Sequence, residues 1–390
     1  MIVITTSPYD VSQNYFVDFR IYAAEKTIKY IASQFKDILT IVTGPHGSIR
    51  PDILLRDTNY LPDIIIQWEY ENTLLEIVSR IIKNKDYSIK SIKNIPNLYL
   101  KTKSGKYFST GFSEENAHPT SFPVIFDSEI IKKYIDKYFG DRYVNGKHKK
   151  VHRFGTLLLQ RGCPYKCKFC FKFFGEKLRS SIDWKQIRSS LEEWLSLGVN
   201  DFFVLDYSFT LDQKYVQKLS NILRDYPSIR LSIQTRCDLL TPEILHYLKR
   251  SNVSFIWLGI ETFDPRIHKL INKYQNINVI YNSIELLLNS DFEFGGFIQF
   301  GLPGENLKSM SKTIENISKF KLTYTKSIIL HAPLYGTETY KLAEKEYPWI
   351  GNNWSDIALV RGLVNNSMTP SLLINTVKLL RRREMLKSNF

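Results

Sequence analysis

Residues 161–170 read Arg161-Gly-Cys-Pro-Tyr-Lys-Cys-Lys-Phe-Cys170, and this stretch holds three of the four cysteines of the chain. Their spacing is Cys163-x3-Cys167-x2-Cys170. Thiolates are the usual ligands of iron–sulfur clusters, and a cubane cluster normally takes four of them. Three cysteines can therefore hold three irons and leave the fourth iron open, as a catalytic metal site keeps one position for a ligand. The stretch predicts an open [4Fe–4S] site.

Two other interpretations of the cysteines have to be weighed. A buried stripe on one helix face would need a helix here, whereas Gly162 and Pro164 favour a loop. A structural zinc site usually shows two CxxC pairs, or one such pair with two histidines. Only Cys237 remains as a fourth thiol. A zinc-stabilised, basic nucleic-acid-binding protein stays as the alternative that is not an enzyme.

Composition bounds the class of protein. The 390 residues favour two domains and can bury a large core. Clustered cysteines without a disulfide framework fit a reducing compartment, so we expect a cytoplasmic protein. No apolar run approaches the ~20 residues that span a bilayer, and we expect no membrane partner. The net charge is +14, but the basic residues are spread along the chain, so a nucleic-acid partner is not expected.

The first 82 residues alternate short apolar strands with helical patterns. This order predicts a small, doubly wound, Rossmann-like parallel sheet. Ligands of such sheets bind beyond the carboxyl ends of the strands, which here include the loop 44–48. The expected strands are Ile2–Thr5, Leu39–Thr43 and Asp63–Ile66, and the expected helices are 22–35 and 72–82.

Residues 83–150 are polar and irregular, and we expect a linker there. Lys101-Thr-Lys-Ser-Gly105 is a candidate hairpin turn within it. Asn116-Ala-His-Pro-Thr-Ser-Phe-Pro123 reads as an extended connector, because residues before proline avoid the helical conformation.

Residues 151–337 repeat a strand–helix rhythm six times, which predicts a partial (β/α)6 barrel in an α/β fold. Residues 338–390 read as a helical extension. Polar and glycine residues follow each expected strand, and barrel active sites are built at these carboxyl ends. The segments concerned are the cysteine loop, 206–208, 235–237, 261–262, 301–305 and 331–333.

Over residues 150–340 the chain resembles the radical S-adenosylmethionine (SAM) enzymes. The likeness is carried by CxxxCxxC with Phe169 before its last cysteine, and by four further segments. These are Leu258-Gly-Ile-Glu-Thr262, the glycine-rich strand 295–305, Val204-Leu-Asp-Tyr-Ser-Phe-Thr210 and Pro333-Leu-Tyr-Gly-Thr337. Two departures are Leu205-Asp206-Tyr207 in place of an acidic pair, and Tyr335 before the turn glycine.

The resemblance implies a role for each matching residue. Cys163, Cys167 and Cys170 would ligate a [4Fe–4S] cluster. Phe169 would contact the adenine of SAM. Glu261 would bind the ribose or the amino group of SAM, and Arg236 would face the carboxylate of SAM. The strand bearing Ile298 and Leu302 would pack on the adenine, and Asp206 and Ser208 would belong to the cofactor site. No catalytic residue is assigned, and Cys237 is either a hydrogen donor at the site edge or a core cysteine.

A second resemblance lies in the N-terminal part. Val42-Thr-Gly-Pro-His46, Pro62-Asp-Ile-Ile-Ile66 and Glu69-Tyr-Glu71 are similar to the latter half of the cobalamin-binding domain that precedes many radical SAM cores. That domain also has a DxHxxG loop whose histidine can ligate cobalt, and no counterpart precedes Met1-Ile-Val-Ile4. The expected domain is therefore incomplete, cobalamin is left open, and a partner chain could complete the domain.

The resemblance implies that a reduced cluster cleaves SAM to a 5′-deoxyadenosyl radical, with flavodoxin or ferredoxin as an external electron donor. The expected substrate is a small molecule, a natural product or a peptide, and the expected reaction is C-methylation. The alternative is a cobalamin-independent dehydrogenase, epimerase, mutase or cross-linking enzyme. A methylthiotransferase is disfavoured because no further set of three cysteines is present.

Overall fold

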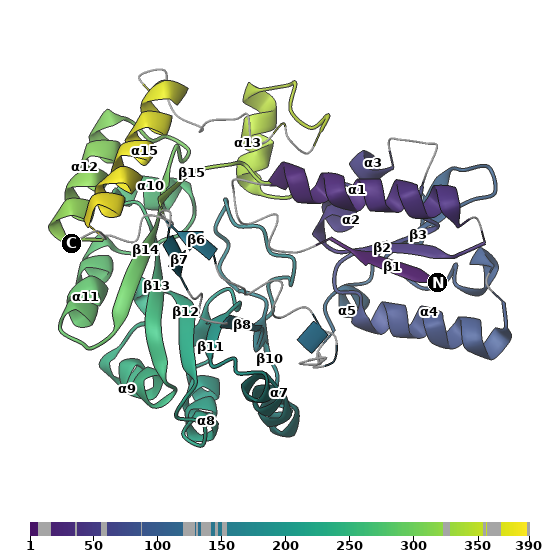
Figure 1. Ribbon diagram of the computed structural model, residues 1–390. Helices are drawn as coiled ribbons and strands as arrows, with labels where there is room; N and C mark the ends of the chain where they lie inside the picture. The colour runs from purple at the N-terminus through teal and green to yellow at the C-terminus, as the bar shows by residue number, and fades with distance from the viewer. Residues whose placement is uncertain are drawn as a thin grey trace.

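The computed structural model describes residues 1–6, 17–35, 37–55, 61–86, 88–119, 129, 132–133, 142–144, 147–149, 154–322, 328–353, 356 and 368–387. Two sheets organise these residues, and Figure 1 shows them side by side, with the N-terminal sheet on the right. The larger sheet has six strands and the smaller has five.

The six-stranded sheet confirms the predicted partial barrel. Its strands are parallel throughout and neighbour one another in chain order. Their carboxyl ends therefore meet at one edge, as in other parallel α/β folds. The strands are β8 (Phe154–Leu157), β11 (Asp201–Val204), β12 (Arg230–Arg236), β13 (Val253–Glu261), β14 (Glu293–Phe300) and β15 (Ile328–Leu330).

Helices follow these strands and cover one face of the sheet (Figure 1). Several begin at a capping side chain that accepts a backbone N–H bond, which satisfies one of the exposed donors of a first turn. Asp183, Asp212, Thr241 and Asn306 are such caps. The helices are α7 (Trp184–Ser196), α8 (Gln213–Leu223), α9 (Pro242–Arg250), α10 (Pro265–Leu270), α11 (Ile277–Leu288), α12 (Leu307–Lys319) and α15 (Pro370–Lys387).

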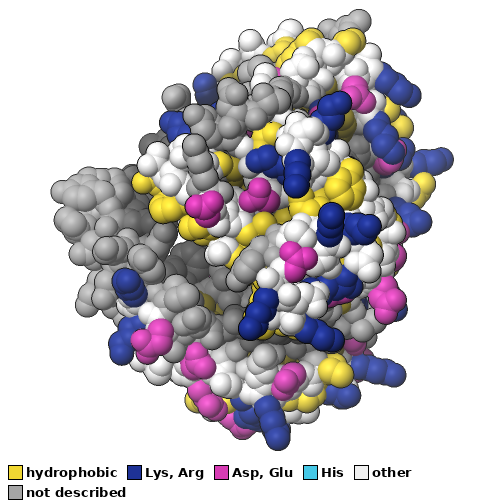
Figure 2. Space-filling model, turned by 90° about the vertical axis from the view of Figure 1, so that its right-hand side faces the viewer, with side chains coloured by type: hydrophobic (Ala, Val, Ile, Leu, Met, Phe, Trp, Pro, Cys, Tyr) yellow, Lys and Arg dark blue, Asp and Glu magenta, His cyan; other side chains and the backbone are white. Residues whose placement is uncertain are grey.

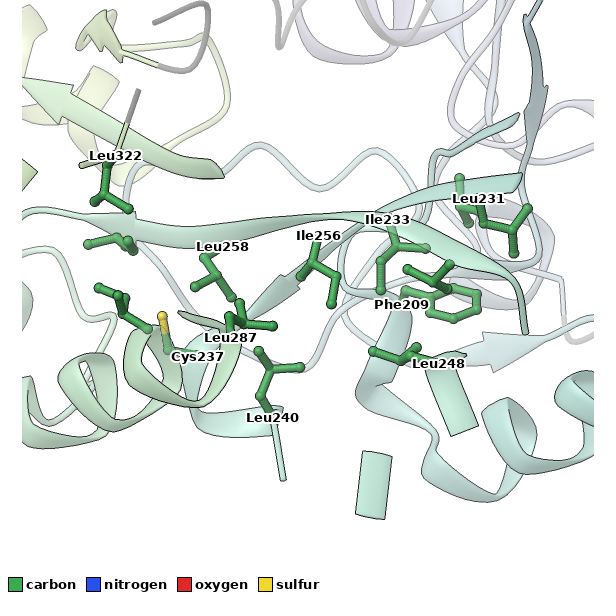
Figure 3. Packing of buried hydrophobic residues seen from close by; sticks show 14 of the residues in the cluster. Phe209, Leu231, Ile233, Cys237, Leu240, Leu248, Ile256, Leu258, Leu287 and Leu322 are labelled. Carbon is green, nitrogen blue, oxygen red and sulfur yellow. The ribbon is translucent and has the colours of Figure 1, made fainter. Parts of the chain in front are cut away.

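Alternation along the central strands separates a core face from an inner face. Ile256, Leu258 and Ile260 of β13 are fully buried, whereas Trp257 and Gly259 between them are only partly buried. A strand has a side-chain period of two, so these two sets point to opposite faces of the sheet. Figure 3 shows part of the core on the helix side, including Ile233, Cys237, Leu240, Ile256, Leu258 and Leu287.

The five-stranded sheet combines parallel and antiparallel pairs. β1 (Ile2–Thr5), β2 (Thr40–Thr43) and β3 (Ile64–Ile66) are parallel, and β4 (Leu98–Lys101) and β5 (Tyr107–Ser109) continue the sheet antiparallel. Figure 1 shows α1 (Val17–Gln34) and α4 (Glu71–Asn84) on opposite faces, as expected for a doubly wound sheet. The expected loop at 44–48 is largely the short helix α2 (Pro45–Ile49), followed by α3 (Pro51–Leu54).

The stretch expected to be a linker differs from that expectation. Residues 98–109 form β4 and β5, so this part belongs to the N-terminal sheet. The predicted turn at 101–105 is confirmed: the Thr102 N–H donates to the Lys106 carbonyl, and Gly105 has a φ of +78°. The stretch also contains α5 (Glu114–Ala117) and the pair β6 (Arg142–Val144) and β7 (Lys147–Lys149), while most of the connector beyond residue 119 lies outside the described residues. The domain boundaries stay predictions.

A mixed apolar cluster joins the N-terminal sheet to the segment after β15. Val42 and Ile65 from the sheet pack in one cluster with Tyr335 and Tyr340. The Arg50 guanidinium lies 5.0 Å from the centre of the Tyr335 ring and donates to the Gly351 carbonyl at 2.8 Å. Tyr335, the unexpected tyrosine of the turn, is 2% exposed and therefore fills this junction. Tyr340 lies on α13 (Glu338–Glu346).

The surface shown in Figure 2 has Lys and Arg side chains dispersed among acidic and hydrophobic ones. This dispersal agrees, for that face, with the expectation of a solvated basic surface. Among the described helices, none combines the length and the hydropathy that a membrane crossing requires.

Gly162 gives a first test of the fold, because its φ is +84° and an added Cβ would lie 2.1 Å from the Lys177 carbonyl oxygen. We expect Gly162→Ala to destabilise the protein by about 1–3 kcal/mol or more, through backbone strain and this contact. Thermal unfolding measures the loss. Gly105→Ala is the matched control, since Gly105 has a similar φ of +78° but open space around it. Equal losses in the two variants would contradict the crowding at Gly162.

Candidate active site

The cysteine loop is closed at its base by a two-stranded antiparallel pair. β9 (Gln160–Arg161) precedes the loop and β10 (Arg179–Ser180) follows it, with Arg161 opposite Arg179. The loop starts at the carboxyl end of β8, so the six-stranded sheet carries it at the predicted edge. All three cysteines of the loop are free thiols; Cys163 is buried, and Cys167 and Cys170 are partly buried.

Bonds to distant segments hold the loop in place. The Lys168 N–H donates to the Ile271 carbonyl at 2.9 Å, and the Lys168 carbonyl accepts from the Thr339 N–H at 3.1 Å. The ammonium of Lys172 donates to the carbonyls of Cys163 and Tyr165. The loop is thus bonded at its middle to the residue that follows α10 and to the first turn of α13 (Glu338–Glu346), which limits its freedom before any cluster binds.

Arg236, at the end of β12, reaches the loop. Its Nη1 lies 3.8 Å from the Cys167 sulfur, and its guanidinium lies 3.6 Å from the centre of the Tyr165 ring. Asp238 engages Nε and Nη2 at 2.8 Å each, and Nη2 also donates to the Lys273 carbonyl. Arg236 therefore brings a fixed positive charge beside the cysteines, with Nη1 as the donor closest to them.

Glu261 lies at the centre of a buried chain of polar side chains. Its Oε1 accepts from the Lys273 ammonium at 2.6 Å, and its Oε2 accepts from the Gln299 amide at 2.6 Å. Gln299 in turn bonds Nδ1 of His331 at 3.2 Å. Lys273 has room because Gly259 lacks a Cβ, which would lie 2.7 Å from the ammonium nitrogen. Glu261 itself has a φ of +67°, a strained conformation of the kind found at functional sites.

The expected adenine contacts form an apolar wall beside this chain. Phe169 packs against a small buried cluster of Ile267, Ile271 and Leu302, and the Lys273 ammonium lies 5.7 Å from the centre of its ring. Ile298, fully buried, is the register partner of Glu261 across β13 and β14. The structure thus brings Phe169, Leu302, Glu261 and Arg236 around the cysteine loop, while Ile298 belongs to the core, opposite Glu261 on the neighbouring strand.

Asp206 and Ser208 have mainly structural partners. The Asp206 carboxylate is 1% exposed and accepts from the backbone N–H groups of Leu159 and Gln160 at 2.8 and 3.0 Å. The Ser208 hydroxyl bonds that of Thr235 at 3.1 Å. Asp206 therefore fixes the chain just before the cysteine loop, and the SAM contact predicted for the two residues stays a prediction.

Cys237 belongs to the core. Its side chain is fully buried in the hydrophobic cluster of the barrel, and its thiol lies 3.9 Å from the Gly259 carbonyl oxygen (Figure 3). Burial raises the pKa of Cys237 to about 12. The structure favours the core interpretation over a hydrogen donor.

Charges around the loop act on its thiols. Burial raises the pKa of Cys163 and Cys167, and the positive charge of Arg236 acts in the opposite direction on both. Among the described residues, no group of three His, Cys, Asp or Glu side chains converges on a single metal ion. A cubane places each thiolate on a different iron, so three separate thiols in one short loop suit it.

Sequence reasoning missed several residues of this site. Lys273 and Gln299 join Glu261 only through the fold, and Asp238 was not recognised as the partner of Arg236. His331 was expected at this edge of the sheet, but its bond to Gln299 was not. Lys273 follows α10 in a polar run without a motif, and Gln299 sits within an apolar strand. Alternation was the available signal for Gln299, because it is a polar residue two positions from Phe297 on the inner face.

Known proteins share this architecture. The Radical SAM superfamily profile matches residues 157–317. The chain is 24% identical to an uncharacterized methyltransferase, PH0819, of Pyrococcus horikoshii, over 85% of this chain and 69% of that protein. It is 23% identical to the anaerobic magnesium-protoporphyrin IX monomethyl ester cyclase of Rubrivivax gelatinosus, over 80% and 54% of the two chains.

Solved structures agree on the fold. The radical SAM methyltransferase TsrM of Kitasatospora setae, solved with tryptophan and a SAM analogue, has a TM-score of 0.68 at 15% identity over 88% of this chain and 65% of its own. The cobalamin-dependent radical enzyme OxsB has a TM-score of 0.60 at 15% identity, over 99% and 53%. The present chain thus spans roughly half to two thirds of these proteins.

The fold and the profile together define the class: this is an enzyme of the radical SAM type. Residues 157–317 form a radical SAM domain, and the structural neighbours of the chain include cobalamin-dependent enzymes. The family fold implies a [4Fe–4S] cluster and SAM as cofactors.

The Asp206 carboxyl predicts a pH dependence of stability. Burial raises its pKa to about 7, well above its ordinary value, despite two backbone N–H bonds. Between about pH 4 and pH 7 the folded protein keeps a proton that the unfolded chain has lost, so stability falls as pH rises through this window. The amide side chain of Asp206→Asn cannot ionise. We therefore expect the unfolding temperature of this variant to rise relative to that of the wild type between about pH 5 and about pH 8.

The control for this measurement is Asp291→Asn, at a carboxylate whose side chain is 85% exposed. The difference in unfolding temperature between Asp291→Asn and the wild type should not rise between about pH 5 and about pH 8. A constant difference for Asp206→Asn would show that Asp206 is ionised in the folded protein.

Proposed function

We propose that Cys163, Cys167 and Cys170 hold a [4Fe–4S] cluster and that the protein cleaves SAM there to modify a small-molecule or peptide substrate by C-methylation. The observation that carries this proposal is the set of three free thiols in one loop at the carboxyl edge of a parallel half-barrel, with Arg236 beside them. The bound cluster supplies the electron that breaks SAM into methionine and a 5′-deoxyadenosyl radical.

The side chains around the loop suit a zwitterionic, hydroxylated ligand. Arg236 offers Nη1 to a carboxylate, because Asp238 fixes the rest of its guanidinium. The Glu261 carboxylate, held between Lys273 and Gln299, can accept from an amino or hydroxyl group of SAM. Phe169 and Leu302 provide an apolar surface for adenine. In this proposal these residues bind and orient SAM beside the cysteine loop.

Methylation is supported by the methyltransferases among the relatives, PH0819 and TsrM, and by the N-terminal sheet that the chain shares with cobalamin-dependent neighbours. Cobalt ligation does not fit the two described histidines beside that sheet. Of the described histidines near that sheet, His46 is 1% exposed in α2 and His118 is bound to Glu69. We therefore derive no step through cobalamin, and this observation favours cobalamin-independent radical chemistry as the second candidate.

The cysteines provide the direct test. Anaerobic, iron–sulfide-reconstituted protein is incubated with SAM and dithionite, and 5′-deoxyadenosine is measured. We expect Cys163→Ala, Cys167→Ala and Cys170→Ala each to abolish its formation, because three irons need three thiolates. Cys237→Ser is the matched control and should retain the wild-type rate, since Cys237 is a core residue.

A wild-type protein that holds zinc without iron would overturn the proposal in favour of the nucleic-acid-binding alternative. Parallel reactions with and without hydroxocobalamin separate the two candidate reactions. Formation of S-adenosylhomocysteine only in the reaction with hydroxocobalamin supports methylation. Equal yields of 5′-deoxyadenosine with and without hydroxocobalamin support cobalamin-independent chemistry.

Glu261 provides a test of the SAM contacts. Glu261→Gln removes the charge that both holds Lys273 and accepts from SAM, and hydrogen bonds to charged groups contribute about 1.5–3 kcal/mol. We expect KM for SAM to rise about tenfold or more, with a smaller change in kcat. Glu285→Gln on the exposed side of α11 is the control. An unchanged KM for Glu261→Gln would exclude Glu261 from SAM binding.

A further inference from the structure

The base of the cysteine loop has an unusual charge arrangement. Arg161 and Arg179 are register partners in the antiparallel pair β9–β10, and both are nearly buried, at 6% and 5% exposure. Like charges directly opposite each other on paired strands destabilise the pairing. Burial strengthens the repulsion, because the interior screens charge less than water does. The pair that closes the loop therefore needs a counter-ion.

The counter-ion comes from the other sheet. Glu69 follows β3, and its side chain is fully buried. Its Oε2 accepts from Nη1 of Arg161 at 2.6 Å and from Nη1 of Arg179 at 3.1 Å, and its Oε1 accepts from Nη2 of Arg179 at 2.6 Å. One carboxylate thus bridges both arginines. Glu71 adds a second acceptor for Arg161 at 2.6 Å.

The same network reaches into the loop. Arg179 donates to the Phe174 carbonyl at 2.7 Å, and the Arg161 guanidinium lies 5.0 Å from the centre of the Phe174 ring. The Gly175 carbonyl accepts from the Cys163 N–H at 3.2 Å. Arg161 is also only two residues from Cys163. Any shift of the two arginines therefore moves the backbone that carries the first cysteine.

The charge state of Glu69 agrees with this role. Burial alone would raise its pKa, but the bonds from His118 and the two arginines outweigh burial and hold the pKa below its ordinary value. His118 lies 3.0 Å from the Glu69 Oε1. A buried charge of this kind persists only when it is paired and fully hydrogen-bonded.

We propose that Glu69 is a positioning residue for the cluster: a carboxylate of the N-terminal sheet neutralises the opposed arginines at the base of the cysteine loop and so fixes where Cys163 is held. This inference rests on the proposed function of the loop. It gives the N-terminal sheet a role that does not depend on cobalamin, because the sheet completes the cluster site from outside the barrel.

The test compares Glu69→Gln with wild-type protein after anaerobic reconstitution. The substitution keeps the shape of the side chain and removes its charge. We expect a changed electron paramagnetic resonance spectrum of the reduced cluster, and iron content or 5′-deoxyadenosine formation reduced about tenfold, as for other groups that orient metal ligands. Glu76→Gln is the matched control. Glu76 forms a partly exposed ion pair with Arg80 on α4, a helix that covers the N-terminal sheet.

Restoring the charge balance sharpens the test. In Glu69→Gln/Arg179→Gln one positive charge is removed with the negative one, and Glu71 remains for Arg161. We expect this double variant to recover part of the cluster signal that Glu69→Gln loses. A purely structural role predicts instead that the double variant recovers only unfolding temperature, because the two side chains are in contact, and that the spectrum of the bound cluster is unchanged in both variants.

The outcomes separate this inference from the function on which it rests. A wild-type protein that binds no cluster removes the proposed function itself. A wild-type protein that cleaves SAM, with Glu69→Gln equal to it in spectrum, iron content and rate, overturns the role of Glu69 alone. If Glu69→Gln does not fold, Glu69→Asp decides the question. It keeps the charge but shortens the reach to two arginines, and an unchanged spectrum there also overturns the inference.

Discussion

The buried carboxylate of Glu69 between Arg161 and Arg179 is the interaction on which the arrangement of the two sheets and the cysteine loop depends. Two arginines face each other where the loop closes, and the interior offers them no water. Their charges are compensated by a residue more than 90 positions away in the chain. Because a buried ion without its partner is costly, separating the N-terminal sheet from the loop base would destabilise both. The apolar junction around Tyr335 also joins the N-terminal sheet to the segment after β15.

The half-barrel accounts for the composition of the site. Parallel strands deliver their carboxyl ends to one edge, so residues from separate strands meet there without a long loop. Alternation then sorts the side chains of each strand: the core set packs under the helices, and the inner set includes Glu261 and Gln299. Lys273 enters from the segment after α10, in the space that Gly259 leaves. The site is a polar strip held between a rigid core and the cysteine loop.

The N-terminal sheet contributes more than a covering for the barrel. It is extended by β4 and β5, packs on α13 and the turn at Tyr335, and supplies acidic residues to the loop base. Its own histidines are occupied or buried, so its firmest link with the chemistry is electrostatic and mechanical.

The sequence by itself determined the features that depend on short range: the cysteine spacing, the strand–helix order of the six-stranded sheet, and the hairpin turn at 101–105. Each rests on periodicity or turn chemistry within a few residues. Only the tertiary structure decided that β4 and β5 join the first sheet, that Lys273 and Gln299 hold Glu261, and that Glu69 meets Arg161 and Arg179. These contacts join segments far apart in the chain, and any of several charged residues would have satisfied the local pattern. Burial and geometry selected the partners.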